Sequence, residues 1–324
     1  MFYAANICLK NSHDGMQSIW VLGEALMDCV AQSDGSLRPL MGGSPFNLAR
    51  AAALRGAQVG FINPLSIDLF GQQMRTQFEA DGVEPLSPPS LLPTSLAVVQ
   101  INRGQPSYGF YREGIADRDY SVDQVLGLLS SHTPGILHTG SLVLVPPEHH
   151  KVIAVLKGAK QKGWTISVDV NLRPKLASDL AQYVAAVKDI VALADWLKAS
   201  DEDLETLGFA NPSRANAAEI AKHFTAQGIS RLALTFGGHG AWLRVDGQDA
   251  EQDVPVITLV DSVGAGDTFW GNCLGDWALQ NEGASLRVAS TLRSAMVAAA
   301  MNCTLTGCQP PRFQDVHKEL ETPT

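Results

Sequence analysis

The residues with the clearest chemical potential form a glycine-rich turn that leads into a carboxylate. Residues 259–271 read LVDSVGAGDTFWG, which we interpret as a strand end, the turn Gly264-Ala265-Gly266, and an apolar helix from Asp267 to about Gln280. Small residues at a helix start leave backbone N–H groups facing outward, where they hold anions such as a phosphoryl group. A carboxylate beside that anion suits the abstraction of a proton from an attacking hydroxyl. An Asp that only caps the helix is the alternative from this segment alone.

A second polar segment lies near the front of the chain. Residues 42–49 read GGSPFNLA and precede a helix that we expect to end near Gly56. Paired glycines allow the backbone to approach a polar ligand closely, and the Asn47 amide can both donate and accept hydrogen bonds. The alternative is a simple glycine turn in which Asn47 is satisfied at the start of the helix.

Several classes of protein are disfavoured by the sequence. It contains no G-x-x-x-x-G-K-[ST], and no G-x-G-x-x-G follows the first strand-like run, which argues against Walker ATPases and Rossmann dehydrogenases. The formal net charge is −9, from 33 acidic and 24 basic side chains, and no Lys/Arg run stands out. We therefore expect neither a nucleic acid nor a membrane surface as partner.

The cysteines and the first residues bear on the compartment. Five cysteines without a C-x-x-C pair favour reduced thiols in a cytoplasmic protein over a disulfide framework or a zinc site. Residues 1–15 lack the regions of a signal peptide, and no later run is long and apolar enough to span a bilayer. Because Met16 begins the first strand-like segment, we interpret residues 1–15 as a disordered leader or start-site artefact and residues 16–324 as one domain.

The elements that must position the two segments follow an α/β pattern. After Gln17, short runs rich in Val, Ile and Leu alternate with segments of helical period. Residues 152–159 show helical spacing and precede the strand TISVD (165–169), and residues 217–224 precede RLALT (231–235) in the same way. The sequence therefore predicts a mostly parallel sheet covered by helices.

Strand-like runs near the front break this alternation. Segments 36–41, 95–101 and 107–112 are strand-like, and the last two are separated only by NRGQP (102–106), which predicts a hairpin turn. We expect a small β layer, formed by segments near 36–41 and 95–112, that lies over the active site as a lid.

The order of the two glycine-rich segments, about 220 residues apart, resembles that of the ribokinase-like (PfkB) carbohydrate kinase family, closest to the bacterial fructokinases. The resemblance runs from about Ile19 to Pro311 and implies a ribokinase-like three-layer sandwich with a small β lid. The further segments that carry it are GEALMD (23–28), FYREGIAD (110–117), LHTGSL (137–142), DVNLRP (169–174), LKASDEDLETLG (197–208) and TFGGHGAW (235–242).

The resemblance implies a role for particular residues. Gly264, Ala265 and Gly266 would form an anion hole beside the base Asp267, and Arg173 would lie near the sugar or the moving phosphoryl group. The residues that would bind the sugar are Asp28, Gly43, Asn47, Phe110 and Arg112. The residues that would line the ATP site are Thr235, Gly237, Gly240 and Asn302, the last within the segment 299–307 that would support the adenine.

Two metal roles are implied in the same way. The family's Asn-x-x-Glu, whose Glu organises Mg²⁺ through water, aligns with residues 200–203, so Asp203 would hold that place with a shorter side chain. Neighbouring Glu202 and Glu205 are the substitutes. A monovalent cation such as K⁺ often lies beside the glycine-rich turn in this family, and Asp261 is the matching candidate ligand.

The chain also departs from the family pattern. Family members usually carry Gly-x-x-Gly-Asp-Asp before a Phe-Gly pair, where this chain reads NPLSIDLFG (63–71) and lacks two glycines and one carboxylate. The helix after Asp267 carries Asn272 where a small residue is usual. We expect a different turn at the first place and altered packing at the second.

The function implied is the phosphorylation of D-fructose by ATP to fructose 6-phosphate and ADP. A 2-keto-3-deoxygluconate kinase is the main alternative, a nucleoside kinase a more distant one, and an inactive sugar-sensing relative belongs to another class. The acid sugar needs a dedicated cation, which Arg112 or Arg103 would have to supply. Exposed lid strands also make a homodimer through the lid an expectation.

Overall fold

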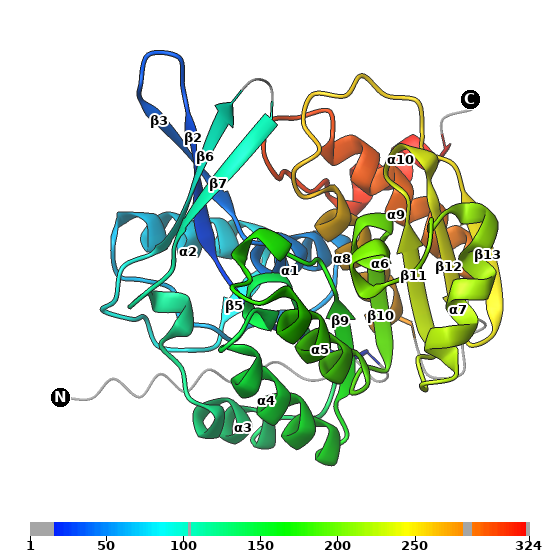
Figure 1. Ribbon diagram of the computed structural model, residues 1–324, viewed down its shortest axis with the longest axis horizontal. Helices are drawn as coiled ribbons and strands as arrows, with labels where there is room; N and C mark the ends of the chain where they lie inside the picture. Colours follow the sequence, from blue (N-terminus) through cyan, green and yellow to red (C-terminus); the bar gives the residue numbers. More distant parts are fainter. Residues whose placement is uncertain (1–15, 103–104, 281–286, 322–324) are drawn as a thin grey trace.

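A nine-stranded sheet forms the centre of the computed structural model, which describes residues 16–102, 105–280 and 287–321 (Figure 1). Neighbouring strands pair in parallel except at β12, which is antiparallel to both β11 and β13. In spatial order the strands are β13 (Gln248–Gln252), β12 (Ala241–Val245), β11 (Arg231–Thr235), β10 (Trp196–Ser200), β9 (Thr165–Asp169), β8 (Ile136–Gly140), β1 (Ile19–Leu22), β4 (Val59–Phe61) and β5 (Val83–Pro85). The predicted mostly parallel sheet is confirmed, whereas the predicted leader, residues 1–15, lies outside the described residues.

Helices cover both faces of this sheet because its strands are apolar on both sides. Along β1, Ile19 and Val21 join one buried cluster, while Trp20 and Leu22 join the other. The helices of the first cluster are α1 (Ser44–Arg55), α2 (Leu69–Asp81), α8 (Ala265–Ala278) and α9 (Val288–Asn302), with α10 (Phe313–Glu321) against α9. Those of the second are α3 (Val122–Ser130), α4 (His149–Gln161), α5 (Leu180–Val191), α6 (Asp201–Leu207) and α7 (Ala217–Thr225).

A separate four-stranded sheet projects from the body beside α1 and α2 (Figure 1). Its strands, in spatial order, are β3 (Leu37–Gly42), β2 (Leu26–Ala31), β6 (Ser95–Asn102) and β7 (Gln105–Tyr111). Strand β2 carries Asp28 and pairs in parallel with β6, while β6 and β7 pair antiparallel. The strands predicted at 36–41, 95–101 and 107–112 are thus present. Part of the predicted hairpin turn, residues 103–104, lies outside the described residues.

The predicted strand end at Leu259 is wrong. No regular element lies between β13 and the start of α8 in this described stretch, and Leu259 and Val260 are exposed. The apolar run pairs with no strand, and β13 remains the edge strand on that side of the nine-stranded sheet. Instead, the Val260 and Asp261 amides donate to the carbonyl of Cys303, at 2.9 and 3.2 Å. Strand β1 also begins three residues later than the predicted start at Met16.

Helices α1 and α8 pack so closely that two glycines are required between them. A Cβ on Gly271 would lie 2.8 Å from both the Leu48 carbonyl oxygen and the Ala51 Cβ. A Cβ on Gly275 would lie 2.9 Å from Arg55 and 3.1 Å from the Ala52 carbonyl oxygen. The residues in contact advance together along both helices, so the two helices run parallel and begin at the same place.

We expect Gly271→Ala to lower the free energy of unfolding by about 1–3 kcal/mol, the usual cost of overpacking a buried contact. The added methyl group would meet backbone atoms of α1 that cannot move alone. The matched control is Gly127→Ala on the exposed face of α3, where an added Cβ meets no atom within 4 Å. It should stabilise the protein by up to about 1 kcal/mol through helix propensity. Urea unfolding would measure both, and equal effects would contradict the packing argument.

Candidate active site

The starts of α1 and α8 meet at the carboxylate of Asp267. The Ser44 hydroxyl donates to its Oδ1 at 2.7 Å, and the Asn47 side-chain amide donates to its Oδ2 at 2.9 Å. Ser44 and Asn47 are three residues apart on α1 and therefore share one helix face. No bond from the carboxylate to the amides of α8 is present among the described residues, so Asp267 does not act as the helix cap that the sequence left open.

Asp267 is buried, with 7% of its surface exposed. Burial raises the pKa of this carboxyl above its ordinary value, while the hydrogen bonds from Asn47 and Ser44 and the charges of Lys198 and Arg173 act in the opposite direction. Burial thus makes Asp267 a stronger base than an exposed carboxylate, while the donors and cations around it favour its charged form.

The glycine turn before Asp267 has a shape that only glycine permits at Gly264. This residue has φ +75°, and a Cβ on it would lie 2.2 Å from the Cys308 Sγ. It forms the N-terminal boundary of α8 without a side-chain cap, although the Ala265 amide already donates to the Ser262 carbonyl at 3.2 Å. A helix start of this kind suits an anion. A Cβ on Gly266 would lie 3.2 Å from the Lys198 Nζ, which places an ammonium group beside the turn.

Lys198 is the buried cation of the site. Its Nζ donates to both oxygens of Asp169, at 2.9 and 3.0 Å, and both side chains are almost wholly buried. Burial opposes the charge of Lys198, but Asp169, Asp203 and Asp267 outweigh it and raise the pKa of the ammonium group. Lys198 therefore stays protonated and contributes a fixed positive charge next to the anion-ready turn.

Asp28 lies on β2 of the four-stranded sheet, which we call the lid, and Arg173 lies in the loop after β9. Both interact electrostatically with Asp267. Burial raises the pKa of Asp28 to about 6, with Arg173 acting to lower it and Asp267 and Asp261 acting to raise it further. Gly42 leaves the room for this carboxylate, because a Cβ there would lie 2.2 Å from the Asp28 Oδ2. The Arg173 Nη1 donates to Asn171 Oδ1 at 2.7 Å, which holds the guanidinium in the loop.

The lid contributes Arg112 and Phe110. The Arg112 Nη1 donates to Asp117 Oδ2 at 3.1 Å and to Ser95 Oγ at 3.3 Å, whereas its buried Nη2 has no hydrogen-bond partner among the described residues. Phe110 packs against a small apolar cluster of Leu26, Ala97 and Leu142. Arg112 is thus tied to the root of the lid and keeps one donor group for a ligand.

Asp261 and Asn302 fasten the glycine turn to the segment after α9. The Asp261 carboxylate accepts from the Val263 and Gly307 amides, at 3.0 and 2.9 Å. The Asn302 side chain donates to the Val263 carbonyl at 2.8 Å and accepts from the Gln309 amide at 2.7 Å. Both side chains therefore hold the backbone around the turn, and their predicted K⁺ and nucleotide contacts stay predictions.

Both carboxylate oxygens of Asp203 accept hydrogen bonds from neighbouring residues. Its Oδ1 accepts from the Leu172 amide at 2.7 Å, and its Oδ2 accepts from the Ser200 amide and hydroxyl, both at 2.8 Å. No group of three His, Cys, Asp or Glu side chains that could hold a metal ion occurs in the described part of the chain. The predicted role of Asp203 toward Mg²⁺ therefore stays a prediction.

The remaining predicted residues lie at the end of β11. Thr235 is its last residue, and Gly237 and Gly240 flank a short 3₁₀ turn with φ +50° and +88°. A Cβ on Gly240 would lie 2.2 Å from the Gln252 carbonyl oxygen, so this glycine is required for the turn. Among the described residues none of these three makes a hydrogen bond to Asp267, and their contact with a nucleotide stays a prediction.

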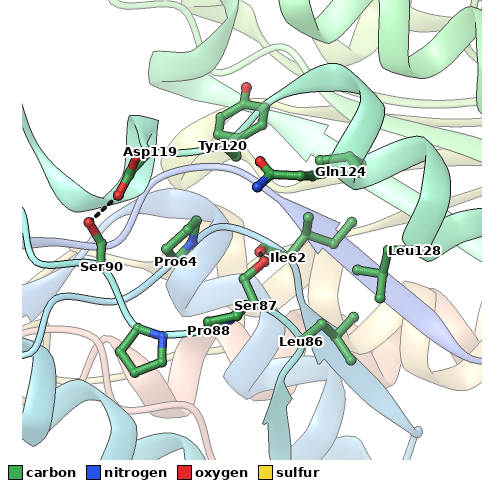
Figure 2. Close-up of a pocket in the computed structure, with 12 residues that line it drawn as sticks. Ile62, Pro64, Leu86, Ser87, Pro88, Ser90, Asp119, Tyr120, Gln124 and Leu128 are labelled. Carbon is green, nitrogen blue, oxygen red and sulfur yellow. Dashed lines mark hydrogen bonds between the residues drawn. The ribbon is translucent and has the colours of Figure 1, made fainter.

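A cavity of about 330 Å³ lies away from all of these groups (Figure 2). Its walls come from residues 86–90, which lead into β6, and from residues 119–128, which follow β7. The Ser90 hydroxyl donates to the Asp119 carboxylate across it. None of the predicted site residues lines this cavity.

Sequence reasoning missed Ser44, Asp169 and Lys198. All three lie inside segments that carried the family resemblance, so the signal was present but was not resolved to these residues. The missing information was spatial, because Ser44 lies 223 positions from Asp267 and Lys198 lies 29 positions from Asp169. A lysine within an otherwise apolar strand, as in WLKAS, is the signal that could have indicated a buried ion pair.

The chain is similar to carbohydrate kinases in each comparison with known proteins. A family model described as pfkB family carbohydrate kinase matches residues 16–314. A fructokinase of Rhizobium leguminosarum bv. trifolii is 30% identical over 284 residues, which cover 85% of this chain and 84% of the relative.

Two solved structures share the fold over almost their whole length. Fructokinase from Xylella fastidiosa with bound ATP is 25% identical, with a TM-score of 0.79 over 95% of this chain and 100% of the other. Fructokinase from Vibrio cholerae, with fructose, ADP and calcium bound, is also 25% identical, with a TM-score of 0.80 over 95% and 100% of the two chains.

We expect Lys198→Met to lower the free energy of unfolding by about 3–5 kcal/mol, because Asp169 would remain buried without its cation. The double variant Lys198→Met/Asp169→Leu removes both charges and should regain most of this loss. The control Lys222→Met breaks the exposed pair with Glu219 and should cost less than about 1 kcal/mol. Guanidinium unfolding measures all three, and a double variant as unstable as the single one would overturn the assignment of Lys198–Asp169 as a compensated pair.

Proposed function

The chain belongs to the pfkB family of carbohydrate kinases, and from this we propose that it transfers the γ-phosphoryl group of ATP to the 6-hydroxyl of D-fructose, giving fructose 6-phosphate and ADP. The observation that carries the proposal is the buried Asp267 carboxylate at the phosphate-ready start of α8, held by donors from α1. Any carboxylate at this position repels a phosphoryl group, so a purely structural role does not explain its presence. A base for the attacking hydroxyl, by contrast, has to lie there.

In this mechanism, the sugar hydroxyl donates its proton to Asp267 as its oxygen attacks the phosphoryl group. The amides of Gly264, Ala265 and Gly266 would donate hydrogen bonds to the transferring group and so stabilise its negative charge. The Lys198 ammonium beside Gly266 would add a positive charge to this stabilisation. Because Lys198 is fixed by Asp169, its charge requires little reorganisation during the reaction. Arg173 interacts electrostatically with both Asp28 and Asp267, and its guanidinium would approach the phosphoryl group from the loop after β9.

A neutral sugar would lie between the lid and the start of α1. The Asn47 Oδ1 is buried and has no hydrogen-bond partner among the described residues, so it is available to accept from a sugar hydroxyl. Asp28 would accept a hydrogen bond from a second sugar hydroxyl, and Phe110 would cover an apolar face of the sugar. The main chain of Gly43, with φ +101°, would present the last contact.

Fructose fits this site better than 2-keto-3-deoxygluconate. The acid sugar adds a carboxylate to a region that already contains Asp28 and Asp267, and the Arg112 guanidinium is already paired with Asp117. One Arg112 donor group without a partner could still reach an acid, and Arg103 lies outside the described residues. The balance of charge favours the neutral ketose.

ATP would enter with its divalent ion, Mg²⁺, as a joint substrate, because the described residues offer no cage of their own. Bound Mg²⁺ supplies charge neutralisation on the phosphates. Asp203 would act on that ion only through water, since its oxygens already hold backbone groups. A K⁺ ion near Asp261 would support the backbone of the turn, and Thr235, Gly237, Gly240 and Asn302 would line the nucleotide.

We also infer a cytoplasmic homodimer that forms through the lid. In the described residues, β3 and β7 each have one edge without a strand partner, and such edges pair readily between copies. Reduced buried cysteines accord with a cytoplasmic location. No helix among the described residues is long and apolar enough to cross a membrane.

The proposal is tested by a phosphorylation screen of the purified protein with MgATP and a panel of sugars. We expect D-fructose to give the highest kcat/KM, and Asp267→Asn to lower kcat at least about 100-fold, the scale of a lost general base. The control Asp179→Asn changes an exposed helix cap on α5 and should leave kcat within about twofold. A higher kcat/KM for 2-keto-3-deoxygluconate would replace fructose as substrate, and an active Asp267→Asn would remove the base.

The KM for fructose should depend on pH through Asp28. Its pKa is raised to about 6, so the carboxylate is ionised above that pH and becomes protonated as the pH falls through it. We expect the KM to rise below about pH 6, because a charged acceptor binds a hydroxyl more strongly than a neutral one. Asp28→Asn should raise the KM roughly tenfold at pH 8 and remove its change near pH 6.

The same raised pKa predicts an opposite effect on stability. A carboxyl whose pKa is higher in the folded than in the unfolded state stabilises the fold at low pH, and this contribution is lost as the pH rises through about 6. Asp28→Asn should therefore stabilise the unliganded protein at pH 8 while it weakens fructose binding. Thermal unfolding at pH 5 and pH 8 measures this, and a variant less stable at pH 8 would contradict it.

A further inference from the structure

The Ser44 hydroxyl lies at a junction between two buried carboxylates. It donates to Asp267 Oδ1 at 2.7 Å, while the Ser44 backbone N–H donates to Glu24 Oε1 at 3.3 Å. Ser44 and Asp267 each have 7% of their surface exposed, and Glu24 has 1%. Water therefore has little access to the hydrogen bond that joins Ser44 to the carboxylate.

We propose that Ser44 is a positioning residue for phosphoryl transfer: its hydroxyl fixes the rotamer of the Asp267 carboxylate and, by donating a hydrogen bond to Oδ1, favours its charged form. The proposal deepens the proposed function, because it assigns to this chain's own serine the control of the base. Ser44 acts through Asp267 and touches neither the sugar nor the nucleotide in this role.

The hydroxyl has no other task in the described part of the chain. The N-terminal boundary of α1 is Gly43, which supplies no side-chain cap, and the Ser44 side chain does not bond to an amide of its own helix. Serine at a helix start normally serves as such a cap. Here its donor is turned toward α8, so the interaction that the hydroxyl makes is with the base.

Two donors on one helix hold the two oxygens of the carboxylate separately. Ser44 binds Oδ1 and Asn47 binds Oδ2, so the carboxylate plane cannot rotate without breaking one of the bonds. Each oxygen has a further lone pair, which leaves room for the hydroxyl of the sugar. Loss of Ser44 would leave one oxygen without its donor and the plane free to turn about the Asn47 bond.

Glu24 fixes the serine in turn. A carboxylate near the first turn of α1 is stabilised by the helix dipole, and the Ser44 amide is one of the groups left without a partner within the helix. Burial raises the pKa of Glu24 to about 7, with the Arg112 charge acting to lower it. Arg112 lies at the end of the lid sheet, so the position of Ser44 is linked to the lid root.

Several other groups act on the charge of Asp267 from the elements around it. Lys198 on β10 and Arg173 after β9 favour the ionised form, whereas Asp28 on β2 and Asp169 on β9 disfavour it. Cys308, after α9, also faces it but stays a neutral thiol because burial raises its pKa. Cations and carboxylates thus act on Asp267 in opposite directions, and the hydrogen bond from Ser44 acts on the side of the ionised form.

The test compares the pH dependence of kcat for the wild type and for Ser44→Ala, with saturating fructose and MgATP. Removal of a donor to a buried carboxylate favours its protonated form. We therefore expect the acidic limb of the profile to shift to higher pH by about one unit. On that limb kcat of the variant should be about tenfold lower than that of the wild type, and at higher pH the two should agree. Ser44→Thr keeps the hydroxyl and should restore the profile toward that of the wild type.

A matched control separates this role from a loss of packing. Ser294→Ala removes a serine hydroxyl of the same 7% exposure that also bonds to α8, at Asn272 Oδ1, but not to Asp267. It should destabilise the protein to a similar degree without shifting the acidic limb. An unshifted limb in Ser44→Ala, or an equal shift in Ser294→Ala, would overturn the proposal.

A second measurement does not depend on catalysis. The side-chain carbon resonance of Asp267, identified by its absence in Asp267→Asn, should titrate at higher pH in Ser44→Ala than in the wild type. If the wild type phosphorylates none of the sugars, the proposed function fails while this titration still tests the Ser44–Asp267 interaction. An unchanged titration in an active enzyme would reject the role of Ser44 and leave the kinase assignment in place.

Discussion

The close parallel packing of α1 and α8 is the constraint on which the candidate active site depends. Gly271 and Gly275 let the two backbones approach until side chains can no longer fit between them. At that separation, the first turn of α1 brings Ser44 and Asn47 within hydrogen-bond distance of Asp267 on α8. The positive ends of both helix dipoles then point to one place, which suits the binding of an anion. A wider spacing would retain the sheet and the lid but separate the base from its donors.

Buried charge is the second feature of the site, and it has a cost in stability. Asp28 is held in the folded protein with a pKa near 6, so folding has to work against its ionisation at neutral pH. Lys198 and Asp169 reduce that cost for each other, although burial still raises the pKa of Asp169 to about 7. Such groups are not needed to build an α/β sandwich, whose stability comes from the two apolar clusters on either side of the sheet.

The sequence predicted what depends on local pattern and on family resemblance. The αβ alternation and the strands of the small sheet follow from period and composition within short segments, whereas the role of Asp267 as base rests on the family resemblance and stays a prediction. The strand expected near Leu259 is absent, because an apolar run alone does not show whether another strand lies beside it to pair with. Ser44 and Lys198 could not be assigned from sequence, because their meaning lies in a contact across 223 positions and in a buried ion pair. Pattern therefore located the segments, and packing determined which of their side chains act together.

The departures from the family pattern are filled by side chains that make bonds of their own. Asn63, at the first missing glycine, accepts from the Gly23 amide at 2.7 Å and donates to the Asp117 carbonyl at 2.8 Å. Gly23 precedes the lid strand β2, and Asp117 follows β7, so one buried amide joins both roots of the lid. Asp117 in turn holds Arg112 through a salt bridge. A glycine could make neither side-chain bond. The change at residue 63 therefore replaces backbone freedom with a cross-link between the two ends of the small sheet, one of which leads to Arg112.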